Sequence, residues 1–520
     1  MKKMKKVVAL TLAIGTLFAS AACGGNQTDT LVIEAFDGGY GVQWLYDIVD
    51  AYKQANPDKK VEIKNTTSYD EGFATALTSG SSTTDIYFSR GGYSKYMQSS
   101  TVVAGKQYDS LLANLTDVFE STVAGENITV EEKFVDRNLV QCYVTNDDGD
   151  RTYFAMPWIA GMGGIVYNKN VWKAEWEMPN TTNELIEICR TIKADGYTPM
   201  VYSESDAYWY FVCETWIAQY EGKEGIDSFW NGYDDNGERY TPELLLTNGL
   251  LESYEVVAEL LKNSNGFMDE RSKSADFTMT QTYFLESSNK IAMMPNGDWI
   301  QREMSANYSD EEVNIEFLKT PVISSIVETL QYRNADNSFM SDEMLSAVID
   351  AIDNGETAYE GVSPSDFARL TEARKIYTGL ASHAAYVPAY SSKVALAKDF
   401  LKYMATDEAI RVFTKATNGY TQPFKFDYKT DSVTAPYMKK FMLNTYEMQQ
   451  DGVFVARFAN TSKLFSVGGL KMYGNAGAFE PVFAASNTDD YLSAYDYYMK
   501  EYNYVKSRWS NYLQLAGIGV

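Results

Sequence analysis

Apolar positions in the first hundred residues switch repeatedly between the period of a strand and that of a helix. Short apolar runs that end in turn residues are typical of strands, and apolar side chains three or four positions apart are typical of helices. The predicted strands are residues 31–36, 60–64 and 85–88, and the predicted helices between them are centred on residues 44–52 and 73–77. This alternation predicts a parallel, doubly wound sheet, whose ligands lie beyond the carboxyl ends of the strands. Ligand contacts are therefore expected first in loops 37–41, 65–69 and 89–93.

The stretch from Asp150 to Asn168 holds two strand-like runs separated by Trp158 and three glycines. Glycines between two strands can absorb the backbone rotation that moves one rigid body relative to another. We interpret the stretch as a hinge, with Trp158 facing the space between the two bodies. The alternative is a glycine-rich turn inside one sheet, with Trp158 in the core of that sheet.

Beyond the hinge, the alternation of strands and helices restarts and predicts a second αβ body. Its predicted strands are residues 199–202, 290–294 and 313–318, and its predicted helices are residues 182–194, 208–220 and 245–263. Further helices are predicted after this body, at residues 344–353, 364–378, 394–406, 408–417 and 487–515. Residues 295–299 are expected to form a turn that leads into a helix. Residues 140–144 and 152–156 predict a hairpin closed by a turn at residues 146–149.

The N-terminus has the pattern of an export signal. Four lysines precede an apolar run at residues 7–19, which is too short to cross a bilayer as a helix. The small residues before Cys23 and the glycines after it resemble a bacterial lipobox, although Ser20 stands where leucine is commonest. This resemblance implies a signal peptide over residues 1–22 and a lipidated tether over residues 23–30. The alternative is an ordinary signal peptide in which Cys23 occurs by chance.

Charge and cysteine content exclude several classes of function. The formal net charge is −25, which excludes nucleic acid as a partner because phosphate binding requires clustered lysine and arginine. Cys142, Cys189 and Cys213 are an odd number, so they permit at most one disulfide bond, and we expect them to be buried thiols. The sequence contains no Cys-x-x-Cys motif and no Cys/His spacing that would predict a metal site or a cofactor.

Motifs for nucleophilic catalysis are also missing from the sequence. His383 is the only histidine, so any catalytic dyad or triad that needs histidine would have to use it. No G-x-S-x-G, H-E-x-x-H or phosphate-binding glycine motif occurs. Paired carboxylates of the kind that hydrolyse glycosides are not excluded by counting, but no carboxylate lies in a motif peculiar to a glycosidase. We therefore expect a protein that is not an enzyme.

Aromatic residues are abundant, with 39 Tyr, 25 Phe and 9 Trp. Several lie at the ends of predicted strands or helices: Tyr40, Tyr93, Trp158, Tyr208, Trp209 and Trp299. An aromatic ring offers a rigid apolar face that suits the C–H face of a pyranose, while nearby polar side chains bind its hydroxyls. For each of these residues the alternative is a place in a hydrophobic core.

Several segments, in this order, resemble the extracellular solute-binding proteins of family 1, the sugar-binding receptors of ABC importers related to maltose-binding protein. The segments are the lipobox and residues 84–88, 153–158, 164–169, 292–299 and 396–404. The sharpest match is Ala-Met-Met-Pro-Asn-Gly-Asp-Trp at residues 292–299. The resemblance extends from residue 31 to about residue 426.

The resemblance implies an α/β, two-lobed periplasmic-binding-protein-like fold, in which each lobe is a doubly wound sheet flanked by helices. Residues 31–159 and 318–428 would form lobe 1, and residues 160–317 and 429–520 would form lobe 2. With the aromatic residues above, it yields these candidate ligand-binding residues: Asp37, Tyr40, Ser89, Arg90, Trp158, Tyr208, Trp209, Asn296, Asp298 and Trp299. Ser89 replaces a bulky aromatic residue common in the family, which argues against a maltodextrin ligand.

We expect the protein to capture a carbohydrate, specifically an oligosaccharide, in a cleft between the lobes and to deliver it to an ABC permease. Hinge closure would be the mechanism, and the protein would be a monomer held on the outer face of the cell membrane through lipid on Cys23. Two other classes remain open. One is a secreted carbohydrate-active hydrolase lipoprotein that uses paired carboxylates, and the other is an adhesion or scaffold lipoprotein without a ligand in a cleft.

Overall fold

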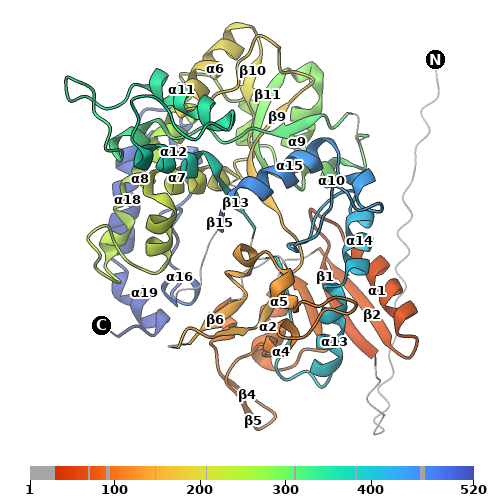
Figure 1. Ribbon diagram of the computed structural model, residues 1–520. Coiled ribbons are helices and arrows are strands. Elements are labelled where there is room, and N and C mark those ends of the chain that lie inside the picture. Colours follow the sequence, from red (N-terminus) through yellow and green to blue (C-terminus); the bar gives the residue numbers. More distant parts are fainter. Residues whose placement is uncertain are drawn as a thin grey trace, which may run out of the picture.

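The computed structural model describes residues 30–67, 71–89, 94–146, 148–206, 208–309, 312–380, 383–456 and 463–519. The predicted signal peptide, Cys23 and Arg90 lie outside the described residues. Figure 1 shows two bodies, each containing strands and helices, with segments of the chain passing between them. The α/β, two-lobed fold class expected from the sequence is confirmed.

The first lobe is built on a five-stranded sheet in the order β2-β1-β3-β14-β8. These strands are β1 (Thr30–Phe36), β2 (Lys60–Thr66), β3 (Ile86–Ser89), β8 (Ala155–Pro157) and β14 (Ala384–Tyr386). The three N-terminal strands run parallel as predicted, and β14 is antiparallel to both β3 and β8. Burial alternates along β1, because one face of the strand packs on the core.

Helix α1 (Gln43–Ala55) packs beside β2 of this sheet, and helices α13 (Val394–Met404) and α14 (Asp407–Ala416) pack against α1. Helix α1 buries Trp44, Leu45, Ile48, Val49 and Tyr52, the residues whose spacing predicted it. The remaining elements of this lobe are α2 (Glu71–Ser79), α3 (Ser94–Met97), β4 (Thr101–Val103), β5 (Lys106–Tyr108), α4 (Thr116–Phe119), α5 (Val130–Lys133), η1 (Asp136–Leu139), β6 (Tyr143–Thr145) and β7 (Arg151–Tyr153). Strands β6 and β7 form the predicted hairpin.

The second lobe contains a mixed sheet in the order β10-β11-β9-β13-β15, with β12 also paired to β9. These strands are β9 (Met162–Asn168), β10 (Thr198–Met200), β11 (Ile291–Gly297), β12 (Ile315–Phe317), β13 (Ile376–Gly379) and β15 (Val453–Ala456). Helices α6 (Thr182–Ala194), α7 (Trp209–Trp230) and α8 (Asn248–Leu261) contribute to the core of this lobe. Helix α7 is kinked at Gly222, whose φ of 78° requires a residue without a Cβ.

The remaining helices complete this half of the protein. They are η2 (Pro242–Leu245), η3 (Glu270–Lys273), α9 (Phe277–Leu285), η4 (Ser287–Asn289), α10 (Ile300–Met304), η5 (Ser324–Glu328), α11 (Asp342–Asp353), α12 (Pro364–Lys375), η6 (Ala435–Tyr437), α15 (Lys440–Asp451), α16 (Lys463–Ser466), α17 (Glu480–Phe483), α18 (Ala494–Lys506) and α19 (Trp509–Ala516). Helix α18 packs on α8, so the C-terminal segment is part of the second lobe. None of the helices in the described ranges is both long and apolar enough to span a bilayer.

Three local predictions were wrong. Residues 295–297 continue β11 instead of turning, because they pair with residues 163–165 of β9. Residues 376–378 belong to β13, whose pairing with β9 and β15 overrides the helical pattern that precedes them. Gly163 and Gly164 lie inside β9, so only Gly161 of the three glycines lies in the connection between β8 and β9.

The sheet assignments also differ from the expected lobe boundary at residue 318. Strand β13 pairs within the second sheet, and helices α11 and α12 bury Leu345, Ile349 and Leu370 in the second core. The chain returns to the first sheet at β14 and rejoins the second sheet at β15. Periodicity indicates the type of an element but not the sheet that receives it, so these additional crossings were not visible in the sequence. Cys142, Cys189 and Cys213 are buried and unpaired, as expected.

Candidate ligand-binding site between the lobes

Three separate segments meet where the chain passes from β8 to β9. The backbone N–H of Trp158 donates to the carbonyl of His383 (3.1 Å), and the N–H of Ala160 donates to the carbonyl of Thr421 (3.0 Å). The N–H of Leu380, which follows β13, donates to the carbonyl of Gly161 (2.8 Å). These bonds hold the segments that connect the two sheets side by side.

A carboxylate lies at the centre of this joint. Asp298 follows β11 of the second lobe, and its Oδ1 accepts a hydrogen bond of 2.7 Å from the hydroxyl of Tyr40, in the loop after β1. Its Oδ2 accepts a bond of 3.4 Å from the N–H of Met162, and its backbone carbonyl accepts one of 2.8 Å from the hydroxyl of Tyr420. Asp298 therefore links the first-lobe loop, β9 and the segment after α14.

Aromatic rings surround Tyr40 in edge-to-face contact. Their centroids lie 5.9 Å from the Tyr40 ring for Trp158, 6.3 Å for Trp299, 5.6 Å for His383 and 5.1 Å for Tyr420. Each such contact contributes about 0.5–1.5 kcal/mol beyond area burial. Only 5% of Tyr40, 4% of Trp158 and 8% of Trp299 is exposed. We call these residues, together with Asp298, the Tyr40 cluster.

Burial controls the ionisation of this cluster. Burial raises the pKa of Asp298 to about 7, against the hydrogen bonds from Tyr40 and Met162 that favour the charged form. Burial, with the charge of Asp298, raises the pKa of Tyr40 and of Tyr420 well above the usual value for tyrosine. The two phenols therefore remain neutral hydrogen-bond donors across the physiological range, while Asp298 titrates near neutral pH.

Two glycines allow the lobes to approach at this joint. A Cβ on Gly39 would lie 2.8 Å from Cβ of Trp299, and a Cβ on Gly161 would lie 2.3 Å from the Tyr40 hydroxyl. Both distances are shorter than the closest approach that two non-bonded atoms normally allow, so a side chain at either position would collide with its neighbour. The glycine-rich loop after β1 is thus explained by close packing against the start of α10, which belongs to the second lobe.

Three other predicted ligand residues lie outside the Tyr40 cluster, at the end of a strand or beside Trp299. Ser89 is buried at the end of β3, and its carbonyl accepts a bond of 3.4 Å from Nε1 of Trp158. The ring of Tyr208 lies 5.5 Å from that of Trp299. Asp37 is partly buried at the end of β1, and its N–H donates to the carbonyl of Thr66 (2.8 Å).

Two predicted residues are enclosed in the protein interior. Asn296 is fully buried in β11, where its Oδ1 accepts a bond of 2.7 Å from the N–H of Gly297. Trp209 is fully buried in the second core, with its ring 6.2 Å from that of Tyr202. Sequence reasoning missed Tyr420 completely and considered His383 only as a catalytic residue. No local motif marks either position, since their neighbours come from distant segments.

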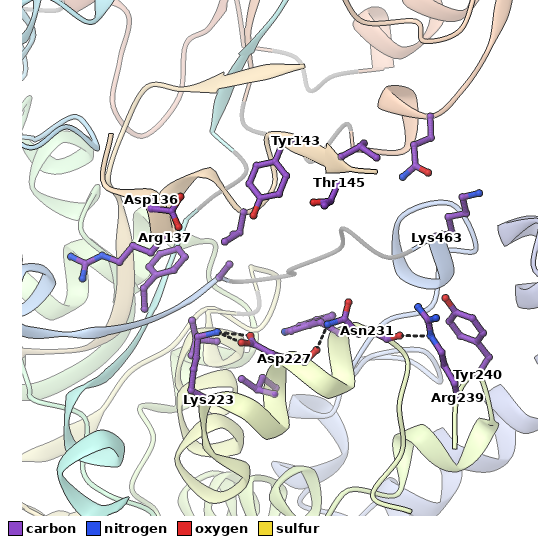
Figure 2. Close-up of a pocket in the computed structure, with 18 of the residues that line it drawn as sticks. Asp136, Arg137, Tyr143, Thr145, Lys223, Asp227, Asn231, Arg239, Tyr240 and Lys463 are labelled. Atoms are coloured by element: carbon purple, nitrogen blue, oxygen red, sulfur yellow. Dashed lines mark hydrogen bonds and ion pairs between the residues drawn. The ribbon is translucent and has the colours of Figure 1, made fainter. Parts of the chain in front are cut away.

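A pocket of about 970 Å³ lies between the lobes, apart from the Tyr40 cluster. Figure 2 shows Asp136, Arg137, Tyr143 and Thr145 on one side of it and residues of α7 and of the loop after α7 on the other. Its volume is in the range typical of small-molecule sites, about 300–1,000 Å³. None of the predicted ligand-binding residues that the structure describes lines this pocket. Within the described ranges, no group of three or more His, Cys, Asp or Glu side chains is arranged to hold a metal ion.

The chain forms two αβ lobes joined by several crossing segments, with aromatic rings and a carboxylate at the joint. This arrangement is that of the two-lobed binding proteins. The sequence profile of the bacterial extracellular solute-binding proteins matches residues 38–411. This protein belongs to that family, whose members are extracellular, bind solutes and work with ABC permeases. No curated protein sequence matches the chain significantly.

Solved structures share the fold at low sequence identity. RafE in complex with raffinose is 12% identical, with a TM-score of 0.56, over 91% of this chain and 99% of RafE. The receptor AcbH, described as preferring β-D-galactopyranose, is 12% identical, with a TM-score of 0.58, over 92% of this chain and 100% of AcbH. Maltose-bound MalE3 of T. maritima is 13% identical, with a TM-score of 0.56, over 92% of this chain and 99% of MalE3.

Proposed function

We propose that this protein captures a carbohydrate, an oligosaccharide, between its lobes and delivers it to the permease of an ABC importer. The observation that carries the proposal is the Tyr40 cluster, where aromatic rings and a carboxylate from both lobes meet at the joint. Aromatic faces suit the C–H faces of pyranoses, and a carboxylate accepts hydrogen bonds from hydroxyl groups. The sugars named for RafE, AcbH and MalE3 support the same ligand class.

The proposed contacts are ligand-binding residues predicted from the sequence, without the enclosed Asn296 and Trp209. They are Asp37, Tyr40, Ser89, Arg90, Trp158, Tyr208, Asp298 and Trp299. We assign Trp209 a structural role, because it is fully buried in the second core. Trp299 and Trp158 would offer ring faces to the sugar, while Asp298 and Asp37 would accept bonds from hydroxyls.

Lobe movement is the mechanism that fits these contacts. The rings of the cluster now contact one another, so a sugar reaches them only after the first-lobe loop separates from the start of α10. Ligand bound to both lobes would replace the contacts between rings and favour closure, by no more than its difference in affinity for the two states. Closed protein would then dock on the permease.

The N-terminus supports a place at the membrane surface. Lipidation of Cys23 after removal of residues 1–22 would anchor a monomer to the outer face of the cell membrane. One acyl chain gives only marginal anchoring, so a diacylglycerol on Cys23 is expected. The protein would return its ligand chemically unchanged, which distinguishes it from a hydrolase.

The test is a thermal-shift screen of the chain from residue 24 onward against mono- and oligosaccharides, with chromatographic recovery of every ligand that gives a shift. A ligand that binds only the native state raises the melting temperature by mass action. A rise with a sugar recovered intact supports the proposal. Recovery of a shortened sugar would favour the hydrolase alternative, and binding of peptides or polyamines but no sugar would overturn the carbohydrate assignment.

A further inference from the structure

The pocket in Figure 2 differs chemically from the rest of this acidic protein. We call it the cationic pocket, and its polar and aromatic lining is Gln98, Asp136, Arg137, Tyr143, Thr145, Lys223, Asp227, Trp230, Asn231, Arg239, Tyr240, Phe454 and Lys463. Arg137 comes from the first lobe, while Arg239 and Lys463 come from the second. A ligand in the pocket would therefore contact both lobes.

Three cations of this pocket have no carboxylate partner in the described part of the chain. The Nη atoms of Arg137 donate to the backbone carbonyls of Gly452 (3.1 Å) and Gln449, and Nε of Arg239 donates to the carbonyl of Asn231 (3.2 Å). No hydrogen bond or ion pair involves the amine of Lys463 within the described residues. Neutral carbonyls orient the two guanidinium groups without cancelling their charge.

The two acidic residues of the pocket are already neutralised. Asp136 pairs with Arg151, which is outside the lining, and Asp227 pairs with Lys223 one helical turn away. The remaining charge of the pocket is therefore positive, although the whole chain carries a formal charge of −25. A local excess of cations against such a background favours an anionic ligand.

Two buried donors in the lining have no acceptor among the described residues. They are Nε1 of Trp230 and Nε of Arg137, and Trp230 is only 6% exposed. Leaving a buried donor unsatisfied is unfavourable, so a ligand that brings acceptor oxygens would gain by pairing with these groups. Both donors are thus suited to the same oxygen-rich ligand as the cations.

The aromatic lining indicates what carries the negative charge. Tyr143 and Tyr240 lie on opposite sides of the pocket in Figure 2, and Phe454 and Asn231 also line it. The Arg239 guanidinium lies 4.5 Å from the centroid of the Tyr240 ring, which positions the cation beside an aromatic face. Rings next to amide and guanidinium donors suit a pyranose that carries a carboxylate.

We propose that the cationic pocket binds the acidic part of an anionic oligosaccharide, one that contains uronate residues. This inference rests on the proposed carbohydrate function and names its substrate class. Three free cations suffice for one or two carboxylates but not for a polyanion such as nucleic acid. Binding to Arg137 on one lobe and Arg239 and Lys463 on the other would also favour the closed arrangement.

The experiment is isothermal titration of the chain from residue 24 onward with matched trisaccharides, in which uronate and neutral sugars share each linkage. At low salt, we expect each uronate-containing trisaccharide that binds to have an affinity at least about tenfold higher than that of its neutral match. This difference in affinity should decrease as added salt screens the charges. Inorganic phosphate, titrated alone, should bind far more weakly. Equal affinity for the two members of each pair, or phosphate binding as tight as that of the uronate, would overturn the inference.

Variants make the test specific to this pocket. Arg239→Gln should remove the preference for uronates over their neutral matches. Because Arg239 is exposed, the melting temperature of the variant without ligand should equal that of the parent. Arg333→Gln is the matched control: Arg333 is exposed, bonds to backbone carbonyls and lies 4.4 Å from the centroid of the Phe339 ring. A preference that survives in Arg239→Gln, or is lost in Arg333→Gln, contradicts the assignment. Binding of neutral sugars without any uronate preference overturns this inference alone, whereas binding of no sugar overturns the proposed function as well.

Discussion

Tyr40 and Asp298 stand 258 positions apart in the sequence, yet the Tyr40 hydroxyl donates a buried hydrogen bond of 2.7 Å to Oδ1 of Asp298. The bond ties the loop after β1 in the first lobe to the end of β11 in the second. Both residues are almost completely buried, so water cannot replace either partner. The state of this pair therefore bears directly on the contact between the lobes.

Replacing Tyr40 with phenylalanine tests that bond. Tyr40→Phe removes the hydroxyl and leaves a buried carboxylate with one donor fewer, which should lower the free energy of unfolding by about 1–3 kcal/mol at pH 8. Urea denaturation gives the value. Tyr46→Phe is the control, because Tyr46 is 38% exposed on α1 and should change stability little. Equal stability of the two variants would show that the bond contributes nothing.

Trp299 allows a test of ligand binding at the joint. Trp299→Ala should abolish carbohydrate binding, because it removes the ring that follows Asp298 and contacts Tyr40, Tyr208 and Phe211. Since Trp299 is only 8% exposed, the change should also destabilise the fold by about 3–5 kcal/mol. Titration calorimetry below the melting temperature separates the two effects.

Trp209→Ala provides the comparison for Trp299→Ala. Trp209 is fully buried in the second core, so its loss should destabilise the protein without a specific loss of affinity in the molecules that remain folded. Unchanged sugar affinity in Trp299→Ala would remove Trp299 from the binding site. Equal loss of affinity in both variants would show that binding reports stability alone.

The sequence was most informative where local pattern and local structure coincide. The spacing of Trp44, Leu45, Ile48, Val49 and Tyr52 predicted α1, which buries all five side chains. The resemblance at residues 292–299 selected Asp298 and Trp299 as ligand-binding residues, and this role stays a prediction. Strand β13 was missed because it follows α12 without a turn, and only its partners in the second sheet make it a strand. Long-range pairing of this kind leaves no periodic signal.

The candidate sites were predictable only in part for the same reason. Tyr40, Trp158 and Trp299 could be selected because each is an aromatic residue beside a predicted turn. Tyr420 and His383 complete the cluster from segments without a motif. Of the cations in the pocket, Arg137 lies in η1, Arg239 in the loop after α7, and Lys463 in α16. No single stretch of the sequence therefore shows them as a group.

Gly161 tests how closely the lobes must approach. In Gly161→Ala the new Cβ would lie 2.3 Å from the Tyr40 hydroxyl, so either Tyr40 or the segment between β8 and β9 must move. We expect a loss of about 1–3 kcal/mol in stability, as for other overpacked sites, and a larger radius of gyration in small-angle X-ray scattering. Gly72→Ala is the control, because a Cβ there meets no atom within 4 Å. An unchanged radius and stability in Gly161→Ala would contradict the close packing.

Glu480 predicts an unusual dependence of stability on pH. It is fully buried at the start of α17, and neither carboxylate oxygen has a hydrogen-bond partner in the part of the chain that the structure describes. Burial, reinforced by the charge of Glu204, raises the pKa of Glu480 to about 7. Burial also raises the pKa of Glu501 and of Asp298 to about 7. The folded protein therefore binds protons at these sites that the unfolded chain, with carboxyl pKa values of about 4, has already released.

The sign of the effect follows from this difference. Because the folded state holds more protons between about pH 4 and pH 7, these groups lower stability as the pH rises through that window, and their cost is constant above it. Glu480→Gln removes one ionisable group, so it should be more stable than the parent at pH 8, by up to about 3 kcal/mol, and nearly equal to it at pH 4. Melting curves across this range give the comparison. Glu360→Gln, at an exposed position, should leave the pH profile unchanged. If Glu480→Gln keeps the pH slope of the parent, Glu480 is not protonated in the folded protein near neutral pH.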